Sequence, residues 1–455
     1  MKKLLFILAI TSLIFIAGCR KYVEIAPEQQ RVLSTTSDYM MLMNNSFTNE
    51  QSYYYPVLSG DDAGSTESTW QNGINVPVAN AYTWADRVFG SNEEDFDWQT
   101  AYRKIFIWNT VIDGIMGSQG TDAEKQTGLS YALVNRAYDY FVLVNLYGKQ
   151  YDRATASTDP AVPLILAPKF LTDLTRASVQ SVYDQITTDL TTALPGLRDV
   201  PDFNTNPSKA AAYALLARVY LHQRDFTNAK RYAEMALAIK STLLDLNAYK
   251  ASPSTFPSKV LNSEELMIKK TGQYPSAFPL SADAENMYDK TRDLRYTVLT
   301  IQGSSGRFPQ FTTTRAYYKA FITNDGGYVG PSVPEIILIK AECEARAGQL
   351  TACLTTLNDF RRKRFDNTQA YPALSASSAD DALRLVIDER KREFVGRGFR
   401  WFDQRRLAKD PGLVAPVIRV FKGITYTLQP GSNRYTYAIA DKYITLNPEI
   451  TQNPR

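Results

Sequence analysis

Histidine and cysteine are scarce in this 455-residue chain, and neither charge sign dominates it. A single histidine, His222, argues against metal catalysis and against Ser-His-Asp chemistry, and the three cysteines form no disulfide framework. We therefore predict no catalytic residues, no metal site and no cofactor. The 51 basic residues nearly balance the 47 acidic ones, for a net charge of +4. Because nucleic-acid-binding proteins usually carry a strongly basic surface, we expect no nucleic-acid partner.

Long hydrophobic runs are also missing, apart from one at the start of the chain. Residues 4–17 carry no charge, but this run is shorter than the ~20 residues that span a bilayer. Lys2 and Lys3 precede the run and Ala17-Gly18-Cys19 ends it, which is typical of a bacterial lipoprotein signal. We predict a signal peptide over residues 1–18 and lipidation of Cys19. An ordinary secretory signal with an incidental cysteine is the alternative.

Removal of the signal would leave residues 19–455, which we expect to form a single domain. The mature chain would carry 49 basic and 47 acidic residues, a net charge of +2. Two or more acyl chains on one residue hold a protein stably at a membrane. The sequence therefore predicts membrane attachment by the lipid anchor only.

Paired helices are indicated in the middle of the chain. A helix is predicted over Ser208–His222, with Asn206 as its cap and Pro207 at its first position. A turn then leads to a second helix, and the spacing of the apolar and small residues fits a tetratricopeptide pair. In that pattern Ala217 and Ala229 touch where the two helices cross.

A second match to the same pattern spans Pro334–Arg364. There Cys353 occupies the small position that Ala229 holds in the first pair, which favours a buried thiol. Cys343 lies on the other side of the turn. The sequence leaves open whether the two cysteines form a disulfide.

The predicted fold class is mainly α, with a tetratricopeptide-like scaffold of about four helix pairs. Two large loop-rich excursions, residues 48–92 and 250–332, are expected to carry short β elements such as Tyr296–Ile301. Long irregular stretches in a compact protein are usually functional. The helical repeats are predicted near residues 94–148, 178–240, 334–364 and 380–406.

Several short motifs follow one another in a fixed order along most of the chain. They are Trp98–Asn109, Arg136–Gly148, Asp293-Leu294-Arg295, the stretch from Glu389 to Arg406, and the tail Asn447–Pro454. Together they resemble the SusD/RagB family of outer-membrane nutrient-binding lipoproteins of Bacteroidetes, and the stretch from Glu389 to Arg406 is the most specific. Two departures stand out. Leu294 replaces the proline of the family's Asp-Pro-Arg turn, and Arg20-Lys21 follows Cys19 where acidic surface-export signals are often found.

The resemblance implies a non-enzymatic protein, lipid-anchored in the cell outer membrane and facing outside. Its implied function is to bind glycan or oligosaccharide for uptake through a SusC-like TonB-dependent transporter. Three alternatives remain: a RagB-like receptor for peptides, a carbohydrate-active hydrolase, and a scaffold lipoprotein that makes only protein contacts.

A hydrolase would need two suitably placed carboxylates, one of them with a raised pKa. The only dense carboxylate set on predicted helices comprises Asp388, Glu389, Glu393 and Asp403, and seven arginines and lysines surround it. Such cations lower the pKa of a carboxyl group and pair with it. We therefore predict that these carboxylates form structural ion pairs.

Aromatic residues in the two excursions are the better candidates for ligand contacts. Aromatic faces pack against the C–H faces of sugars, and a few of them on separate loops would form a shallow platform. Core packing is the competing interpretation for each residue taken singly. The predicted ligand-binding residues are Trp70, Tyr82, Trp84, Tyr288, Tyr317 and Tyr318. Other aromatic residues of the excursions, Tyr296 among them, form a wider pool of candidates for ligand contacts.

Overall fold

A computed structural model describes residues 33–45, 49–169, 173–272, 278–305 and 307–455. The predicted signal peptide and Cys19 lie outside these residues, so both remain predictions. No helix within the described part of the chain is long and apolar enough to cross a bilayer.

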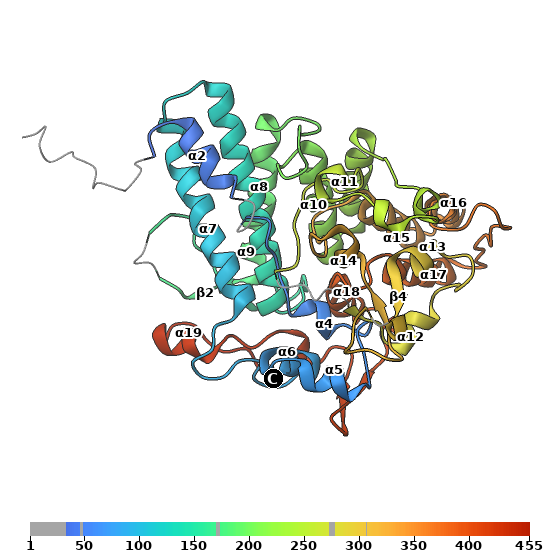
Figure 1. The fold of residues 1–455 in the computed structure, drawn as a ribbon. Helices are drawn as coiled ribbons and strands as arrows, with labels where there is room; N and C mark the ends of the chain where they lie inside the picture. The colour runs from blue at the N-terminus through green and yellow to red at the C-terminus, as the bar shows by residue number, and fades with distance from the viewer. Residues whose placement is uncertain (1–32, 46–48, 170–172, 273–277, 306) are drawn as a thin grey trace, which may run out of the picture.

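Long helices packed in sequence form the scaffold (Figure 1). Helix α7 packs on α8 and α8 on α9, while α10 packs on α11, α11 on α15, and α15 on both α16 and α17. The mainly α, tetratricopeptide-like fold is thereby confirmed. The bounds are α7 (Phe96–Gly114), α8 (Asp122–Tyr147), α9 (Val179–Ala193), α10 (Lys209–His222), α11 (Phe226–Ile239), α15 (Val333–Arg346), α16 (Leu350–Arg362), α17 (Ala379–Glu393) and α18 (Phe399–Leu407).

Side-chain caps explain where several of these helices begin. Asp95 accepts hydrogen bonds from the first turn of α7, and Thr121 forms a capping box with Glu124 at the start of α8. Helix α10 is capped by Ser208, whose hydroxyl accepts a hydrogen bond from the N–H of Ala211 at 3.2 Å. The prediction of Asn206 as the cap was therefore wrong by two residues, because a second capping side chain follows the proline.

The crossing of α10 and α11 has the expected small residues, since Ala217 and Ala229 are both fully buried. Leucine at position 217 would have no space at this crossing. We expect Ala217→Leu to lower the free energy of unfolding by about 1–3 kcal/mol. Denaturant unfolding followed by circular dichroism would measure the change, and a loss below a few tenths of a kcal/mol would mean that the helices do not meet at Ala217.

Cys343 and Cys353 are buried free thiols in the second pair. Cys353 is fully buried on α16, in the small position that the pattern predicted. Burial raises the pKa of Cys343 to about 12 and that of Cys353 to about 11. Both side chains are therefore uncharged and act as small apolar groups in the core.

The two excursions contain more helix than the sequence indicated. The described part of the first excursion contains the short helices α4 (Pro56–Ser59), α5 (Ser68–Gly73) and α6 (Val76–Tyr82). The run Tyr296–Ile301, predicted to be β-like, lies mostly in helix α13 (Leu294–Leu299). Asp293 explains this difference, because its side chain caps α13 by accepting a hydrogen bond from the N–H of Arg295 at 3.0 Å.

Short antiparallel sheets complete the fold. Strands β3 (Phe278–Pro279), β5 (Arg315–Tyr317) and β4 (Thr300–Gln302) form one sheet in that order, in the second excursion. A two-stranded sheet near α9 pairs β1 (Pro160–Pro163) with β2 (Arg176–Ser178), and a hairpin near the C-terminus pairs β6 (Val417–Phe421) with β7 (Ile424–Leu428). Among the described residues, the other α-helices are α2 (Thr36–Met43), α12 (Ala282–Asn286), α14 (Lys319–Thr323) and α19 (Asp441–Leu446).

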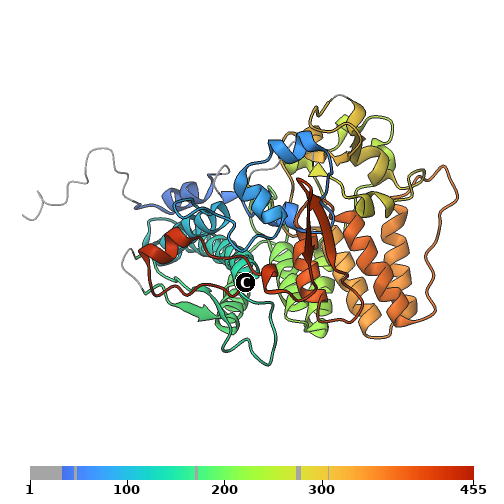
Figure 2. The same ribbon diagram turned by 90° about the horizontal axis from the view of Figure 1, so that it is seen from below.

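The C-terminal hairpin packs on the first excursion, although more than 300 residues separate them in sequence. Seen from below, the red hairpin lies beside the blue helices of that excursion (Figure 2). Arg419 on β6 joins the two, since its guanidinium donates hydrogen bonds to the carbonyl oxygens of Leu58, Gly60, Ala63 and Tyr82. One buried arginine thus satisfies four carbonyl groups of the irregular backbone.

Candidate ligand-binding surface

The three predicted aromatics of the first excursion lie in the core. Trp70, Tyr82 and Trp84 are only 6%, 2% and 3% exposed. The Arg419 guanidinium lies over two of these rings, 4.0 Å from the Tyr82 centroid and 4.6 Å from that of Trp84. The indole N–H of Trp84 donates a hydrogen bond to the carbonyl of Ser59 at 3.0 Å. The polar loop sequence suggested exposure, but the aromatic side chains turn inward and enclose the arginine.

Two of the three predicted aromatics of the second excursion are buried as well. The Tyr288 hydroxyl donates a hydrogen bond to the carbonyl of Arg392 at 2.7 Å. Tyr317 packs close to Arg397, whose charge partly offsets the effect of burial in raising the Tyr317 pKa. Tyr318 is half-buried and so presents part of its side chain to solvent. As a ligand contact, each of the six residues remains a prediction.

Tyr318 belongs to a cluster with Tyr296 and Arg315, which we call the Tyr318 surface. The backbone N–H of Tyr318 donates a hydrogen bond to the carbonyl of Leu299 at 3.0 Å, and this bond holds Tyr318 beside the end of α13. Arg315 comes from β5, and its guanidinium lies 3.7 Å from the ring centroid of Tyr296. All three side chains are half-buried. Antiparallel pairing of β4 with β5 therefore brings together residues almost twenty positions apart.

Hydrogen bonds fix the groups of the Tyr318 surface in place. The Arg315 guanidinium donates to the Thr300 hydroxyl at 2.6 Å, and the Tyr296 hydroxyl donates to the Glu285 carboxylate at 3.0 Å. Burial raises the pKa of Tyr318, and the positive charges of Arg307 and Arg315 partly offset this rise.

These groups define what the Tyr318 surface can recognise. Half-exposed aromatic rings can pack against an apolar ligand face, and guanidinium N–H groups donate to hydroxyl or carboxylate oxygens. The phenol and carboxylate oxygens can accept hydrogen bonds in return. Tyr296 was only in the wider pool of aromatics, because nothing in the local sequence indicates that Arg315 will lie over its ring.

Three of the four carboxylates considered for hydrolysis form ion pairs, namely Glu389, Glu393 and Asp403. Asp388 is exposed on α17 and pairs with no described cation, so the predicted ion pair is wrong for this residue. Glu389 lies 2.7 Å from Arg295, 2.5 Å from Arg361 and 2.8 Å from Arg392. Burial by itself would raise the Glu389 pKa, but these three guanidinium groups lower it to about 2. Asp403, between Arg390 and Arg406 at 3.1 and 2.7 Å, also has a pKa well below its usual value.

Glu393 pairs with Arg295 at 2.9 Å and Arg364 at 3.0 Å, and its pKa is lowered too. Structural pairing of these three carboxylates is confirmed. A glycosidase acid requires the opposite shift, a raised pKa. Across the described ranges, three or more histidine, cysteine or acidic side chains do not come together as a metal-binding group.

Comparison with known proteins agrees with the fold and with the motifs. A family profile described as "Starch-binding associating with outer membrane" matches residues 26–221, and the SusD family profile matches residues 333–455. The chain belongs to the SusD/RagB family. SusD-like protein P2 of Formosa agariphila is 24% identical over an alignment that covers 88% of this chain and 89% of that protein.

Solved structures share the architecture at low sequence identity. A SusD superfamily protein from Bacteroides thetaiotaomicron VPI-5482 matches with a TM-score of 0.74 and 20% identity, over 92% of this chain and 100% of that one. A putative sugar binding protein from Bacteroides vulgatus ATCC 8482 matches with a TM-score of 0.73 and 19% identity, over 93% of this chain and 99% of that one. A laminarin binding SusD-like protein matches with a TM-score of 0.67 and 15% identity, over 92% of this chain and 99% of that one.

Proposed function

We propose that this protein is a non-enzymatic receptor that binds glycan or oligosaccharide at the outer membrane and passes it to a SusC-like TonB-dependent transporter. Family membership supports the proposal, as does the likeness in fold to a putative sugar binding protein and to a laminarin binding SusD-like protein. The observation that carries it is the Tyr318 surface, where the fixed Arg315 guanidinium lies over the half-buried Tyr296 ring and Tyr318 is also partly open to solvent.

Binding at this surface would be weak and specific for shape. One open face removes only part of a ligand from water, and ordering the ligand has a cost. A stacked ring selects sugars with an apolar face, while Arg315 and the tyrosine hydroxyls select the orientation of the hydroxyl groups. A long glycan could lie across such a surface without entering a cleft.

Tyr318→Ala should weaken glycan binding and leave the fold intact. We expect a loss of about 1 kcal/mol, or roughly fivefold in Kd, because one stacking contact is removed. Isothermal titration with laminarin and soluble starch would measure it. Tyr220→Ala is the matched control, since Tyr220 is half-buried on α10 in the helical scaffold. Equal affinities in wild type and Tyr318→Ala would contradict a binding role for this tyrosine.

The ionic strength of the titration separates a neutral glycan from a charged ligand. Arg307 and Arg315 would attract a carboxylate, so a peptide or acidic polysaccharide should bind more weakly as salt rises. A neutral glycan should keep its affinity. Reducing-end assays on the same mixtures test the hydrolase alternative, and sustained release of new reducing ends would rule out a purely binding function.

Cys19→Ala tests the predicted anchor. Without the cysteine no acyl chains can be attached, so the protein should become soluble or remain uncleaved. Cell fractionation with a carbonate wash, followed by immunoblotting, would show this. Retention of the variant in washed membranes would mean that another feature attaches the protein.

A further inference from the structure

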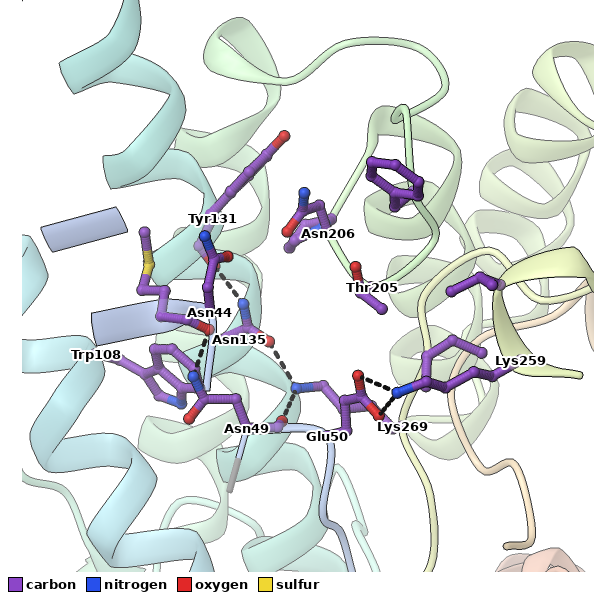
Figure 3. A pocket seen from close by; sticks show the side chains of 15 residues that line it. Asn44, Asn49, Glu50, Trp108, Tyr131, Asn135, Thr205, Asn206, Lys259 and Lys269 are labelled. Atoms are coloured by element: carbon purple, nitrogen blue, oxygen red, sulfur yellow. Dashed lines mark hydrogen bonds and ion pairs between the residues drawn. The ribbon is translucent and has the colours of Figure 1, made fainter. Parts of the chain in front are cut away.

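A pocket of about 330 Å³ opens between the scaffold and the second excursion (Figure 3). Trp108 on α7 and Tyr131 and Asn135 on α8 form one wall, while Phe203 and residues 205–207, 259–260 and 268–269 contribute the other. The pocket shares no lining residue with the Tyr318 surface. Its volume lies at the small end of the ~300–1,000 Å³ typical of small-molecule sites, which suits one or two sugar rings.

Buried polar groups form the floor of the pocket. The Lys269 ammonium donates hydrogen bonds to the Asn49 carbonyl and to the Asn135 side-chain oxygen, both at 2.7 Å. Burial and the neighbouring charge of Lys104 lower the Lys269 pKa to about 7. The side-chain oxygen of Asn49, itself only 6% exposed, has no hydrogen-bond partner within the described part of the chain. A buried acceptor of this kind is satisfied when a hydroxyl donates to it.

Unpaired polar side chains surround the mouth. Asn44 comes from the segment after α2, and the neighbouring residues Thr205 and Asn206 come from the segment before α10 (Figure 3). Their side chains make no hydrogen bond to any other described residue. Amide and hydroxyl groups both donate and accept, so they can match the hydroxyl groups of a sugar.

An aromatic ring stands at the entrance. Phe203 lines the pocket and is 63% exposed, which leaves most of its ring free to contact a ligand. Tyr131, on α8, also lines the pocket. Apolar faces next to unpaired amides are the combination that a pyranose ring, with its C–H face and peripheral hydroxyls, would fill.

The ionic groups of the pocket are largely compensated. Lys259 and Lys270 lie 2.9 and 3.4 Å from the Glu50 carboxylate, so this carboxylate is not available to bind a cation. Lys269 already donates two of its three N–H bonds. The charged groups of the pocket already have partners, whereas its amide and hydroxyl groups can still form hydrogen bonds. The pocket therefore favours an uncharged polar ligand.

We propose that this pocket binds a single neutral pyranose ring, as a second carbohydrate site separate from the Tyr318 surface. The inference adds a second site and a smaller ligand to the proposed function. It rests on the proposed function only in taking the ligand to be a carbohydrate. A ring seated here would contact Phe203, the Asn206 amide and the Lys269 ammonium.

The test uses the full mature protein with glucose, galactose, mannose and xylose as probes. Saturation-transfer NMR would detect binding and calorimetry would give Kd. At least one sugar should bind wild type, and Phe203→Ala and Asn206→Ala should each raise its Kd at least fivefold. Leu261→Ala is the matched control, because Leu261 is 73% exposed and does not line the pocket. Its Kd should equal that of wild type.

Three results would overturn the inference: no binding of any of the four sugars, equal affinity in wild type and both pocket variants, or loss of binding in Tyr318→Ala instead. Titration with laminarin and starch keeps the two proposals apart. Polysaccharide binding without monosaccharide binding would reject the pocket and keep the receptor function. Monosaccharide binding that depends on Phe203, without any polysaccharide binding, would support the pocket and reject the receptor.

Discussion

Arg295→Ala should lower the free energy of unfolding by about 3–5 kcal/mol, because it removes the shared partner of three buried carboxylates. The guanidinium lies 2.7 Å from Asp293, 2.7 Å from Glu389 and 2.9 Å from Glu393. All four side chains are almost completely excluded from solvent. Without Arg295 the three carboxylates would stay buried but lose one of the positive charges that neutralise them.

Urea unfolding of wild type and variant, followed by circular dichroism, would measure this loss. Arg198→Ala is the control, since Arg198 forms an exposed pair with Asp202 at 2.7 Å, and such pairs contribute below about 1 kcal/mol. Similar small losses in both variants would show that the buried network does not stabilise the fold.

Acid titration provides a second readout of the same network. The neighbouring arginines lower the Glu389 pKa from 4.5 to about 2, so this group stabilises the fold fully above its unfolded pKa. That contribution is lost as pH falls from about 4.5 to about 2. In Arg295→Ala the Glu389 pKa should rise, and the loss of stability through this interval should become smaller.

Trp84→Ala should destabilise the protein by about 3–5 kcal/mol, as expected for truncation of a buried tryptophan. The indole packs beneath Arg419 and donates its N–H to Ser59. Trp84 also has a φ of +55°, which is rare for a bulky residue, so its surroundings must hold it in place. The variant would leave a cavity and remove one ring from around the arginine.

Thermal and urea unfolding of Trp84→Ala should show this loss directly. Trp84→Phe is the comparison variant, because it keeps an aromatic ring while it removes the indole hydrogen bond and part of the ring volume. We expect it to lose less stability than the alanine variant. Normal stability in Trp84→Ala, together with weaker glycan binding, would instead return Trp84 to the ligand surface.

The long scaffold helices could be predicted because their own sequences carry the information. Helix α8 has a capping box at Thr121, a repeating apolar face and a glycine at its end, all readable within one segment. Helices α4 to α6, with four to seven residues each, are too short to show a helical period. The run after Asp293 has β-like composition, but the cap and the Asp293–Arg295 pair favour a helix.

The candidate sites depended on contacts that local sequence does not contain. Trp84 and Tyr82 are in the core because Arg419, more than 300 residues later, fits between their rings. Tyr318 is half-buried because it follows the last residue of β5 and its N–H is bonded to the carbonyl of Leu299 at the end of α13. The pocket around Lys269 combines six separate stretches of chain. Residue type narrowed the choice to aromatics of the excursions, and tertiary packing decided which of them reach solvent.

Direct titration of the purified mature protein with a panel of neutral polysaccharides is the sharpest test of its proposed function. We predict saturable binding to at least one of them, little change between 50 and 500 mM NaCl, and no new reducing ends over hours of incubation. Failure to bind any polysaccharide, with saturable binding of peptides under the same conditions, would contradict a carbohydrate receptor.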